Sequence, residues 1–230
     1  MKRAIIAIDG PAASGKSTVG YRVAETLGYL YLDTGVLYRA VTWAALDRGI
    51  PIPDEEQVAR LAETLTIDIQ RPTIGDGRQY TVLVDGRDVT WLLREQPVND
   101  GVSPVAANPG VRAALIDAQR RIGLQGSVVV VGRDIGTVIL PEAEIKVYLD
   151  ATIEERAARR HRENVAQGRP SDLAAVRANL EQRDYIDSHR STSPLAKAPD
   201  AVYLDSTAMS VSQVVERVLG IARRASRCRA

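Results

Sequence analysis

The amino-acid sequence predicts an α/β fold in which helices cover both faces of a parallel β-sheet. Two observations predict it. Short strand-like runs alternate with longer helical stretches along the chain, which is the order of a parallel sheet with helical crossovers. The strand-like runs are continuously apolar and partly β-branched, as strands buried on both faces are. With 230 residues, of which 45% are hydrophobic, the chain can bury one sizeable core, so we expect a single domain over 1–230.

Each element can be assigned from its own residues. The expected strands share apolar runs without polar alternation, and they are Ala4–Ile8, Leu30–Leu32, Val128–Val131, Ile145–Leu149 and Ala201–Leu204. The longer stretches between and after them are typical of helices, and they are Lys16–Leu27, Gly35–Asp47, Pro109–Ile122, Thr152–Gln167, Leu173–Tyr185 and Ser210–Arg224. Ligands of open α/β sheets bind at the carboxyl ends of the strands, so functional residues are expected there.

One segment interrupts this alternation. From residue 65 to residue 89 the sequence LTIDIQRPTIGDGRQYTVLVDGRDV alternates apolar and polar residues and contains two turns of glycine and aspartate, the pattern of small antiparallel hairpins. We expect a β-rich insertion at about 63–103, between core segments 1–62 and 104–230. The triplet Gly-Arg-Asp at 86–88 falls on a hairpin turn, so its charges should be solvated.

The charge balance excludes some classes of partner. Thirty Lys and Arg against 29 Asp and Glu give a net charge of +1, so no global field attracts nucleic acid or an anionic membrane. The first apolar run is cut short by Asp9, and no stretch has the length of a membrane span. The single cysteine, Cys228, has no internal partner, which suits a reducing compartment. We therefore expect a cytoplasmic monomer with no nucleic-acid or membrane partner.

A phosphate-binding loop is the clearest chemical signal. Residues 10–17, GPAASGKS, fit GxxxxGK[ST] between an expected strand and an expected helix, the context that such a loop requires. Glycines let backbone N–H groups turn inward around phosphate oxygens, and the helix start adds its dipole. Lys16 would neutralise the β- and γ-phosphates of a bound nucleotide, and the Ser17 hydroxyl would coordinate the bridging magnesium ion. The residues expected to hold the nucleotide phosphates are Gly10, Pro11, Ala12, Ala13, Ser14, Gly15, Lys16, Ser17 and Thr18.

A phosphate loop leaves three classes of protein open: a kinase for a small acceptor, a GTPase switch, and an ATPase motor or nucleotide sensor. The sequence has no N-K-x-D guanine-reading motif and no acidic pair at the end of an apolar strand, which disfavours the last two. A kinase also needs cations opposite the loop to hold an anionic acceptor. Arg39 and Arg133 meet this demand because each lies at the ligand-facing edge of the expected sheet. The helical stretch EERAARR at 154–160, with Arg159 among its arginines, fits either a solvated face or a functional cluster.

Five stretches together resemble the bacterial-type cytidylate kinase family. They are IDGPAASGKST, LDTGVLYR, SPVAANPGVR, GRDIGTVILP with KVYLDA, and QRDYIDSHR with SPL, in that order over essentially the whole chain. The resemblance implies a P-loop NTPase-type parallel sheet flanked by helices, in which the β-rich insertion forms the NMP-binding region and a short arginine-bearing lid spans about 154–170. It also implies transfer of the γ-phosphoryl group of ATP, with Mg²⁺, to CMP or dCMP.

The resemblance further implies roles for individual residues. The ligands of the acceptor phosphate and their supporting contacts fall on Arg39, Arg133, Arg190, Thr34 and Tyr38. The residues that contact the base and the sugar fall on Ser103, Arg112, Asp134, Arg183 and Asp187. The lid arginines that would reach the ATP phosphates are Arg156 and Arg160, so the expected catalytic set is Lys16, Arg133, Arg156 and Arg160.

One position departs from the family pattern. The family commonly has an acidic residue directly before the Gly-Arg-Asp triplet, and here that residue is Val131. A valine cannot order magnesium or water, so the role of that acid is either dispensable or falls to Asp33 or Asp9. The apolar pattern favours Val131 as a strand residue packed against a helix. A kinase of the same fold for UMP, shikimate or dephospho-coenzyme A is the alternative activity, and a non-catalytic nucleotide sensor is the alternative from another class.

Overall fold

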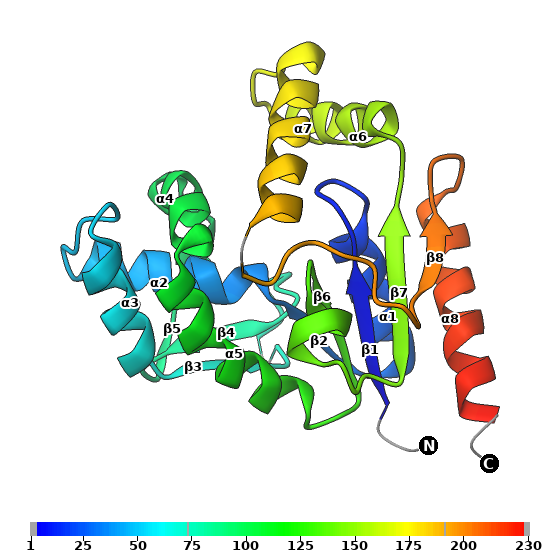
Figure 1. Ribbon diagram of the computed structural model, residues 1–230, viewed down its shortest axis with the longest axis horizontal. Helices are drawn as coiled ribbons and strands as arrows, with labels where there is room; N and C mark the ends of the chain where they lie inside the picture. The colour runs from blue at the N-terminus through cyan, green and yellow to red at the C-terminus, as the bar shows by residue number, and fades with distance from the viewer. Residues whose placement is uncertain (1–3, 73, 191, 228–230) are drawn as a thin grey trace.

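A five-stranded parallel sheet forms the centre of the protein (Figure 1). The structure is a computed structural model that describes residues 4–72, 74–190 and 192–227, so Cys228 lies outside the described residues. In spatial order the strands are β2 (Leu30–Asp33), β6 (Val128–Gly132), β1 (Ile5–Asp9), β7 (Ile145–Asp150) and β8 (Val202–Asp205). Neighbouring strands pair in parallel, so their carboxyl ends share one edge. The predicted α/β class is confirmed.

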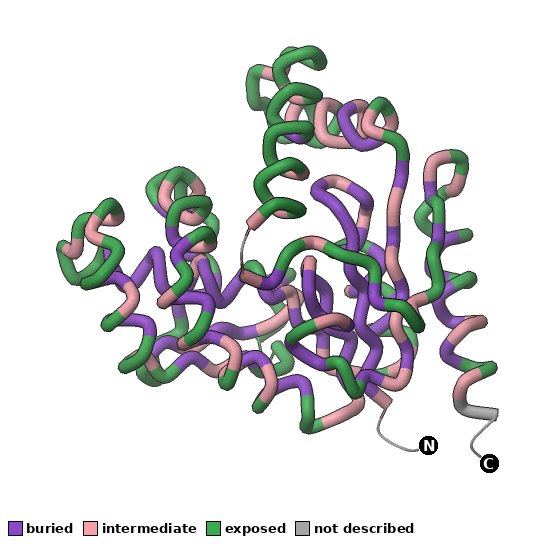
Figure 2. Tube along the Cα trace, viewed as in Figure 1, coloured by how far each residue is buried: buried purple, intermediate pink, exposed green. Residues whose placement is uncertain are grey.

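Two apolar layers enclose this sheet. Alternate residues of the central strands face opposite sides, so Ala7 and Val130 contribute to one layer and Ile8 and Val131 to the other. The first layer includes α2 (Gly35–Asp47), α3 (Glu55–Thr64) and α5 (Pro109–Gly123), and the second includes α1 (Lys16–Leu27) and α8 (Val211–Arg227). Figure 2 shows the central strands as buried. Burial on both faces explains why their sequences do not alternate.

The β-rich insertion is a separate antiparallel sheet. Its strands are β3 (Ile67–Gln70), β4 (Thr81–Val84) and β5 (Arg87–Asp88). Asp85 and Gly86 both have positive φ, 49° and 81°, as the central residues of a tight two-residue hairpin turn do. The side chain of Arg87 is 61% exposed. The first Gly-Arg-Asp triplet is therefore a surface hairpin, as predicted.

Two helices and a short turn were not anticipated from the sequence. Helix α3 has readable signals, because the Asp54 side chain accepts a hydrogen bond from Gln57 N as its N-cap and Val58 and Leu61 lie at helical spacing. The 3₁₀ turn η1 (Leu92–Arg94) and α4 (Gln96–Ala107) follow the insertion sheet. Helix α4 contains Pro97 and Pro104, and proline inside a helical pattern normally argues for a loop.

Two helices, α6 (Ile153–Ala166) and α7 (Leu173–His189), stand above the edge of the sheet and pack on each other (Figure 1). The lid expected at about 154–170 falls on α6 and the loop that follows it. Leu180 is the buried residue of α7, and Figure 2 shows most of this helix as exposed. Without an apolar face the end of α7 has no periodic signal, which explains why it runs past the predicted Tyr185. Among the described helices, none combines the length and the apolar content that crossing a membrane requires.

Candidate active site

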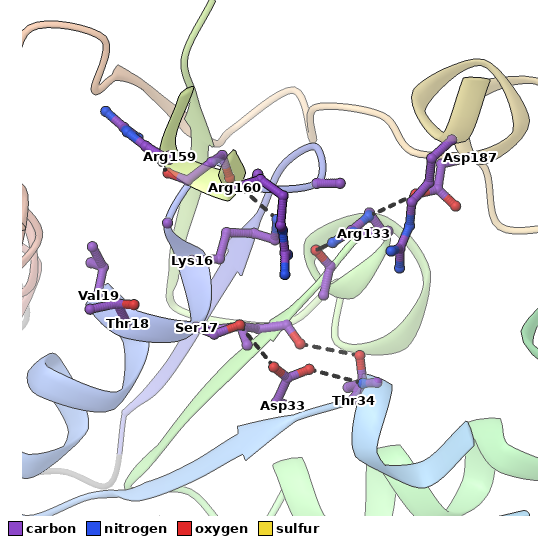
Figure 3. Close-up of a pocket in the computed structure, with 18 of the residues that line it drawn as sticks. Lys16, Ser17, Thr18, Val19, Asp33, Thr34, Arg133, Arg159, Arg160 and Asp187 are labelled. Atoms are coloured by element: carbon purple, nitrogen blue, oxygen red, sulfur yellow. Dashed lines mark hydrogen bonds and ion pairs between the residues drawn. The ribbon is translucent and has the colours of Figure 1, made fainter. Parts of the chain in front are cut away.

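A cleft opens at the carboxyl edge of the parallel sheet, with a volume of about 910 Å³. The phosphate loop and the start of α2 line one part of it, and α4, α6, α7 and the segment after β6 line much of the rest. Figure 3 shows Lys16, Arg133 and Arg160 converging on the space above Ser17 and Thr34. This is the edge at which open α/β sheets bind their ligands.

The backbone of the phosphate loop depends on its glycines. Gly10 has φ 148° and Gly15 has φ 95°, and a Cβ on Gly10 would lie only 2.0 Å from the carbonyl oxygen of Leu149. Helix α1 begins at Lys16, and no side chain of the described residues caps its N-terminus. The first N–H groups of α1 therefore remain available for an anion, and the helix dipole favours one.

Lys16 is held inside the loop. Its Nζ donates to the carbonyl oxygen of Pro11 at 2.5 Å and to Ser14 Oγ at 3.3 Å, and the residue is 6% exposed. Burial lowers the pKa of Lys16 well below its usual range, and the nearby charge of Arg133 lowers this pKa further. A bound phosphate would supply the missing negative charge and stabilise the ammonium form.

Ser17 and Asp33 present the oxygen atoms that suit a magnesium ion. Ser17 Oγ donates to Asp33 Oδ2 at 2.9 Å, and Asp33 Oδ1 accepts a hydrogen bond from Gly35 N. Among the described residues no group of three or more His, Cys, Asp or Glu side chains could hold a metal ion alone. Two protein oxygens fit Mg²⁺ nevertheless, because this ion takes most of its ligands from substrate phosphates and water.

Val131 is a packing residue. It is 1% exposed, and a Cβ on Gly20 would lie 2.5 Å from its Cγ1, so α1 and β6 touch at this point. Its carbonyl oxygen accepts hydrogen bonds from the N–H and the hydroxyl of Thr34. The structure therefore agrees with the packing interpretation of Val131, and Asp33 is the acidic residue that lines the cleft beside Ser17.

The part of the cleft away from the phosphate loop contains a chain of alternating charges. Arg133 Nε lies 2.9 Å from Asp187 Oδ2, and Asp187 Oδ1 lies 3.6 Å from Arg190 Nη1. The chain continues from Arg190 Nη2 to Asp134 Oδ1 at 3.7 Å and from Asp134 Oδ2 to Arg112 Nη2 at 2.8 Å. Three arginines and two aspartates leave one net positive charge, and each aspartate holds two guanidinium groups in place.

Two nitrogen atoms among these five charged side chains have no hydrogen-bond acceptor. Arg112 Nε and Arg190 Nη2 are buried and have no hydrogen-bond partner within the described ranges. Buried polar atoms are normally satisfied, and the exceptions call for an explanation. Arg112 also lies over the ring of Tyr38, 5.5 Å from its centroid, which keeps the guanidinium plane fixed. The orphaned donors fit a ligand that carries acceptor oxygens or ring nitrogens.

The insertion side of the cleft holds Arg39. Its Nη1 donates to the carbonyl oxygen of Leu93 at 3.1 Å and to Asn99 Oδ1 at 2.6 Å. Asn99 is fixed in turn, because its Nδ2 donates to the carbonyl oxygen of Arg94 at 2.9 Å. The segment that follows the insertion sheet therefore orients an arginine that begins on the core helix α2.

The structure brings nearly all of the expected site residues to this cleft. The expected acceptor residues that line it are Thr34, Tyr38, Arg39, Ser103, Arg112, Arg133, Asp134, Arg183, Asp187 and Arg190. The expected ATP residues that line it are Ala12, Ala13, Ser14, Gly15, Lys16, Ser17, Thr18 and Arg160. Gly10 and Pro11 belong to the phosphate loop but do not line the cleft.

Arg156 lies away from the cleft. The guanidinium is buried and donates to the carbonyl oxygens of Ala151 and Ala12, and its Nη1 lies 2.6 Å from Asp184 Oδ2. These contacts tie α6 to the phosphate loop and to α7. The geometry places the Arg156 guanidinium between α6, the phosphate loop and α7, and Arg160 is the expected lid arginine that reaches the cleft.

Several further residues contribute to the cleft, and no individual role was predicted for them. Arg159 donates to the carbonyl oxygen of Ser14 at 3.2 Å and to Ser206 Oγ at 3.0 Å. Tyr80 reaches the cleft from the insertion and stacks on Tyr31, with ring centroids 5.8 Å apart. Arg159 stood within the arginine cluster that the sequence indicated, whereas Ser206 and Tyr80 carry no local pattern that distinguishes them from ordinary loop residues.

Comparisons with known proteins agree with this site. The family model for cytidylate kinase matches residues 6–224. A protein of Geobacillus kaustophilus named cytidylate kinase is 50% identical over 222 residues, which cover 96% of this chain and 97% of that protein. One of Herpetosiphon aurantiacus with the same name is 49% identical over 216 residues, 94% of this chain and 93% of that protein.

A solved structure supports the fold alone. An uncharacterized protein from Eubacterium ventriosum superimposes with a TM-score of 0.51 at 15% identity, covering 95% of this chain and 97% of that one. The family assignment depends on the sequence match, which spans the phosphate loop, the strand-end arginines and the lid. The chain therefore belongs to the cytidylate kinase family.

Proposed function

We propose that the protein is an ATP-dependent kinase that transfers the γ-phosphoryl group of ATP to CMP or dCMP, with ADP and CDP or dCDP as products. The observation that carries this proposal is the chain of alternating charges from Arg133 to Arg112, which faces the phosphate loop across one cleft. Two facing anion sites are what transfer between two nucleotides requires.

On the donor side, the phosphate loop binds and orients ATP. Backbone N–H groups at the start of α1 surround the β- and γ-phosphates, and Lys16 neutralises the charge that develops between them. Ser17 and Asp33, whose oxygen atoms lie 2.9 Å apart, would hold Mg²⁺, which when bound neutralises and aligns the same phosphates.

On the acceptor side, the arginines hold the CMP phosphate for in-line attack. Arg39, Arg133 and Arg190 suit this task because planar guanidinium groups bind phosphate oxygens through paired hydrogen bonds. Their positions are fixed by Asn99 and Asp187. The attacking phosphate oxygen is already an anion, so alignment and charge neutralisation supply the catalysis without a strong general base.

The base and the sugar occupy the inner end of the same charge chain. Cytosine offers an amino donor at position 4 and an acceptor at N3, which complement the carboxylate of Asp134 and the guanidinium of Arg112. Ser103 lines the cleft beside them, and Arg183 and Asp187 are the proposed sugar contacts. Orphaned donors on Arg112 and Arg190 support a polar ligand at this end of the cleft.

The lid completes the site when both nucleotides are bound. Arg160 and Arg159 line the cleft from α6, so closure would bring two cations onto the transferring group and exclude water. Arg156 acts as a positioning residue in this scheme, because its hydrogen bonds join α6 to the phosphate loop. We place the enzyme in the cytoplasm as a monomer.

A coupled assay of ADP release with a panel of acceptors tests the proposal. We expect CMP and dCMP to give the highest kcat/KM, with UMP lower by at least about tenfold because uracil mismatches a carboxylate that reads position 4. With shikimate or dephospho-coenzyme A as the acceptor, the release of ADP should not exceed the background of ATP hydrolysis. Faster turnover with any of these three acceptors than with CMP would overturn the assignment.

A further inference from the structure

Asp9 joins the two halves of the active site from beneath. It is the last residue of β1 and directly precedes Gly10 of the phosphate loop. In the sheet it pairs with Gly132 of β6 on one side and Tyr148 of β7 on the other. It is 4% exposed and lies outside the lining of the cleft, so it does not contact nucleotide from this position.

Both carboxylate oxygens of Asp9 are used by the turn that follows Asp134. Oδ1 accepts the N–H of Ile135 at 2.8 Å, and Oδ2 accepts the N–H of Gly136 at 2.7 Å. These two residues begin the π-helical turn η2 (Ile135–Ile139). A Cβ on Gly136 would lie 3.4 Å from Asp9 Oδ2 and 3.1 Å from Lys146 Cδ, so a residue without a side chain suits this close approach.

The carboxylate is costly to bury, and its charged neighbours do not form an ion pair with it. Burial raises the pKa of Asp9 to about 6, although the two N–H groups oppose this rise; the charge of Asp134 raises the pKa and that of Lys16 lowers it. Tyr148 lies beside it in the sheet, and Lys146 directs its Nζ to Asp200 at 2.8 Å. An apolar residue at this strand end would avoid burying a charge but would leave both N–H groups without an acceptor, so the task of this carboxylate is to hold the turn.

We infer that Asp9 is a positioning residue that fixes the loop carrying Arg133 and Asp134 relative to the phosphate loop. This inference rests on the proposed function, because it assigns Asp9 the task of setting the spacing between the donor and acceptor phosphates. A single residue can fix this spacing, because the backbone of Asp9 leads into the donor loop and its carboxylate holds the acceptor loop. In-line transfer depends steeply on that spacing, with a misplacement of about 1 Å costing about a hundredfold in rate.

The variant Asp9→Asn tests the inference, because asparagine keeps the size but can accept only one of the two N–H groups. We expect kcat/KM for CMP to fall about tenfold to thirtyfold at pH 8, while affinity for a non-hydrolysable ATP analogue stays within about twofold. Asp9→Ala, which accepts neither N–H, should lose about a hundredfold. The matched control is Asp150→Asn, because Asp150 also ends a strand and accepts a backbone N–H, from Ala151 at 2.8 Å, but lies outside the cleft. This control should keep wild-type kinetics within about twofold.

The pH dependence separates positioning from simple support of the fold. A raised pKa means that the folded state takes up a proton as the pH falls through about 6, so acid should stabilise wild-type protein relative to Asp9→Asn in thermal unfolding. The activity of the wild-type protein should fall over the same pH range, because a protonated carboxyl can no longer accept both N–H groups. The ratio of wild-type to Asp9→Asn kcat/KM, in which ionisation of the substrate cancels, should shrink to below about threefold at pH 5.

Three outcomes would overturn the inference. They are an Asp9→Asn variant with unchanged kcat/KM for CMP, an equal loss of CMP turnover and ATP-analogue affinity, and a wild-type to variant ratio that does not change with pH. If Asp9→Ala does not fold, Asp9→Asn and the pH series still decide the question. Wild-type turnover of CMP in the same assay tests the proposed function separately, so failure of that function and failure of the inference give different results.

Discussion

Replacing Asp134 with asparagine removes the charge at the centre of the acceptor site while keeping the size of the side chain. In the wild type, Asp134 Oδ2 lies 2.8 Å from Arg112 Nη2, and Oδ1 lies 3.7 Å from Arg190 Nη2. The Asp134 and Arg112 side chains are 7% and 5% exposed, so solvent screens their interaction little. The variant should therefore change two properties: the orientation of two arginines, and the discrimination between pyrimidine bases.

The two effects differ in how they act on CMP and UMP. Loss of a buried charge-assisted hydrogen bond costs about 1.5–3 kcal/mol, and because it disorders Arg112 and Arg190 it should lower turnover of both nucleotides. Base reading adds a second loss of about 1–3 kcal/mol for CMP alone, since an asparagine amide can donate to the carbonyl of uracil. We therefore expect the ratio of kcat/KM for CMP to that for UMP to shrink at least about tenfold.

The assay measures kcat/KM for CMP and for UMP at saturating ATP and magnesium, in wild type and Asp134→Asn. Thermal unfolding serves as the control, because an ion pair broken on one side destabilises a protein, here by about 1–3 kcal/mol since asparagine keeps one acceptor. The kinetic constants are compared only if the Asp134→Asn variant is folded at the assay temperature. A parallel decline of CMP and UMP would refute the reasoning: Asp134 would then orient arginines without reading the base, and base reading would fall to Ser103 and Arg112.

Four further variants, in three tests, probe the phosphate loop, the two Gly-Arg-Asp triplets and the support of Arg39. Lys16→Met should lower kcat by about a thousandfold or more while the Kd for CMP, measured by calorimetry, stays within a few-fold; near-normal turnover would contradict the role of the phosphate loop. The two Gly-Arg-Asp triplets give a matched pair: Arg87→Ala should keep kcat/KM for CMP within about twofold, and Arg133→Ala should lose on the order of a hundredfold. Equal losses would contradict the separation of surface hairpin and site. Asn99→Ala should raise KM for CMP about three- to tenfold by freeing Arg39, with KM for ATP unchanged; a similar rise for ATP would show a general disturbance instead.

The sequence predicted the core of the fold because its signals there are local. A continuous apolar strand such as Val128–Gly132 is marked by its own residues, and the phosphate loop by glycines at positions that need them. Helix α4 was missed because Pro104 lies in its interior, where proline contradicts a helical pattern, whereas Pro97 in its first turn is compatible with a helix. Its contacts with α2 stabilise a helix that local propensity disfavours.

The site was predictable where a residue occupies a motif and less so where contacts decide its role. Arg133 ends a buried strand, so its position at the cleft followed from the fold. Arg156 and Arg160 lie four residues apart on one helix, yet the former turns toward the phosphate loop and α7 and the latter reaches the cleft. Tyr80, directly before β4, reaches the cleft from a place where its ring stacks on Tyr31 of β2. Such long-range packing leaves no trace in one local stretch of sequence.

Transfer of labelled phosphate from ATP to CMP is the direct test of the proposed reaction. Wild-type protein is incubated with γ-labelled ATP, magnesium and CMP, and the labelled products are separated. We expect label to appear in CDP in a one-to-one ratio with ADP and free inorganic phosphate to stay at the level found without CMP. Release of the label as inorganic phosphate, with CMP unchanged, would contradict phosphoryl transfer, because a cleft with two facing anion sites would then hydrolyse ATP without serving an acceptor.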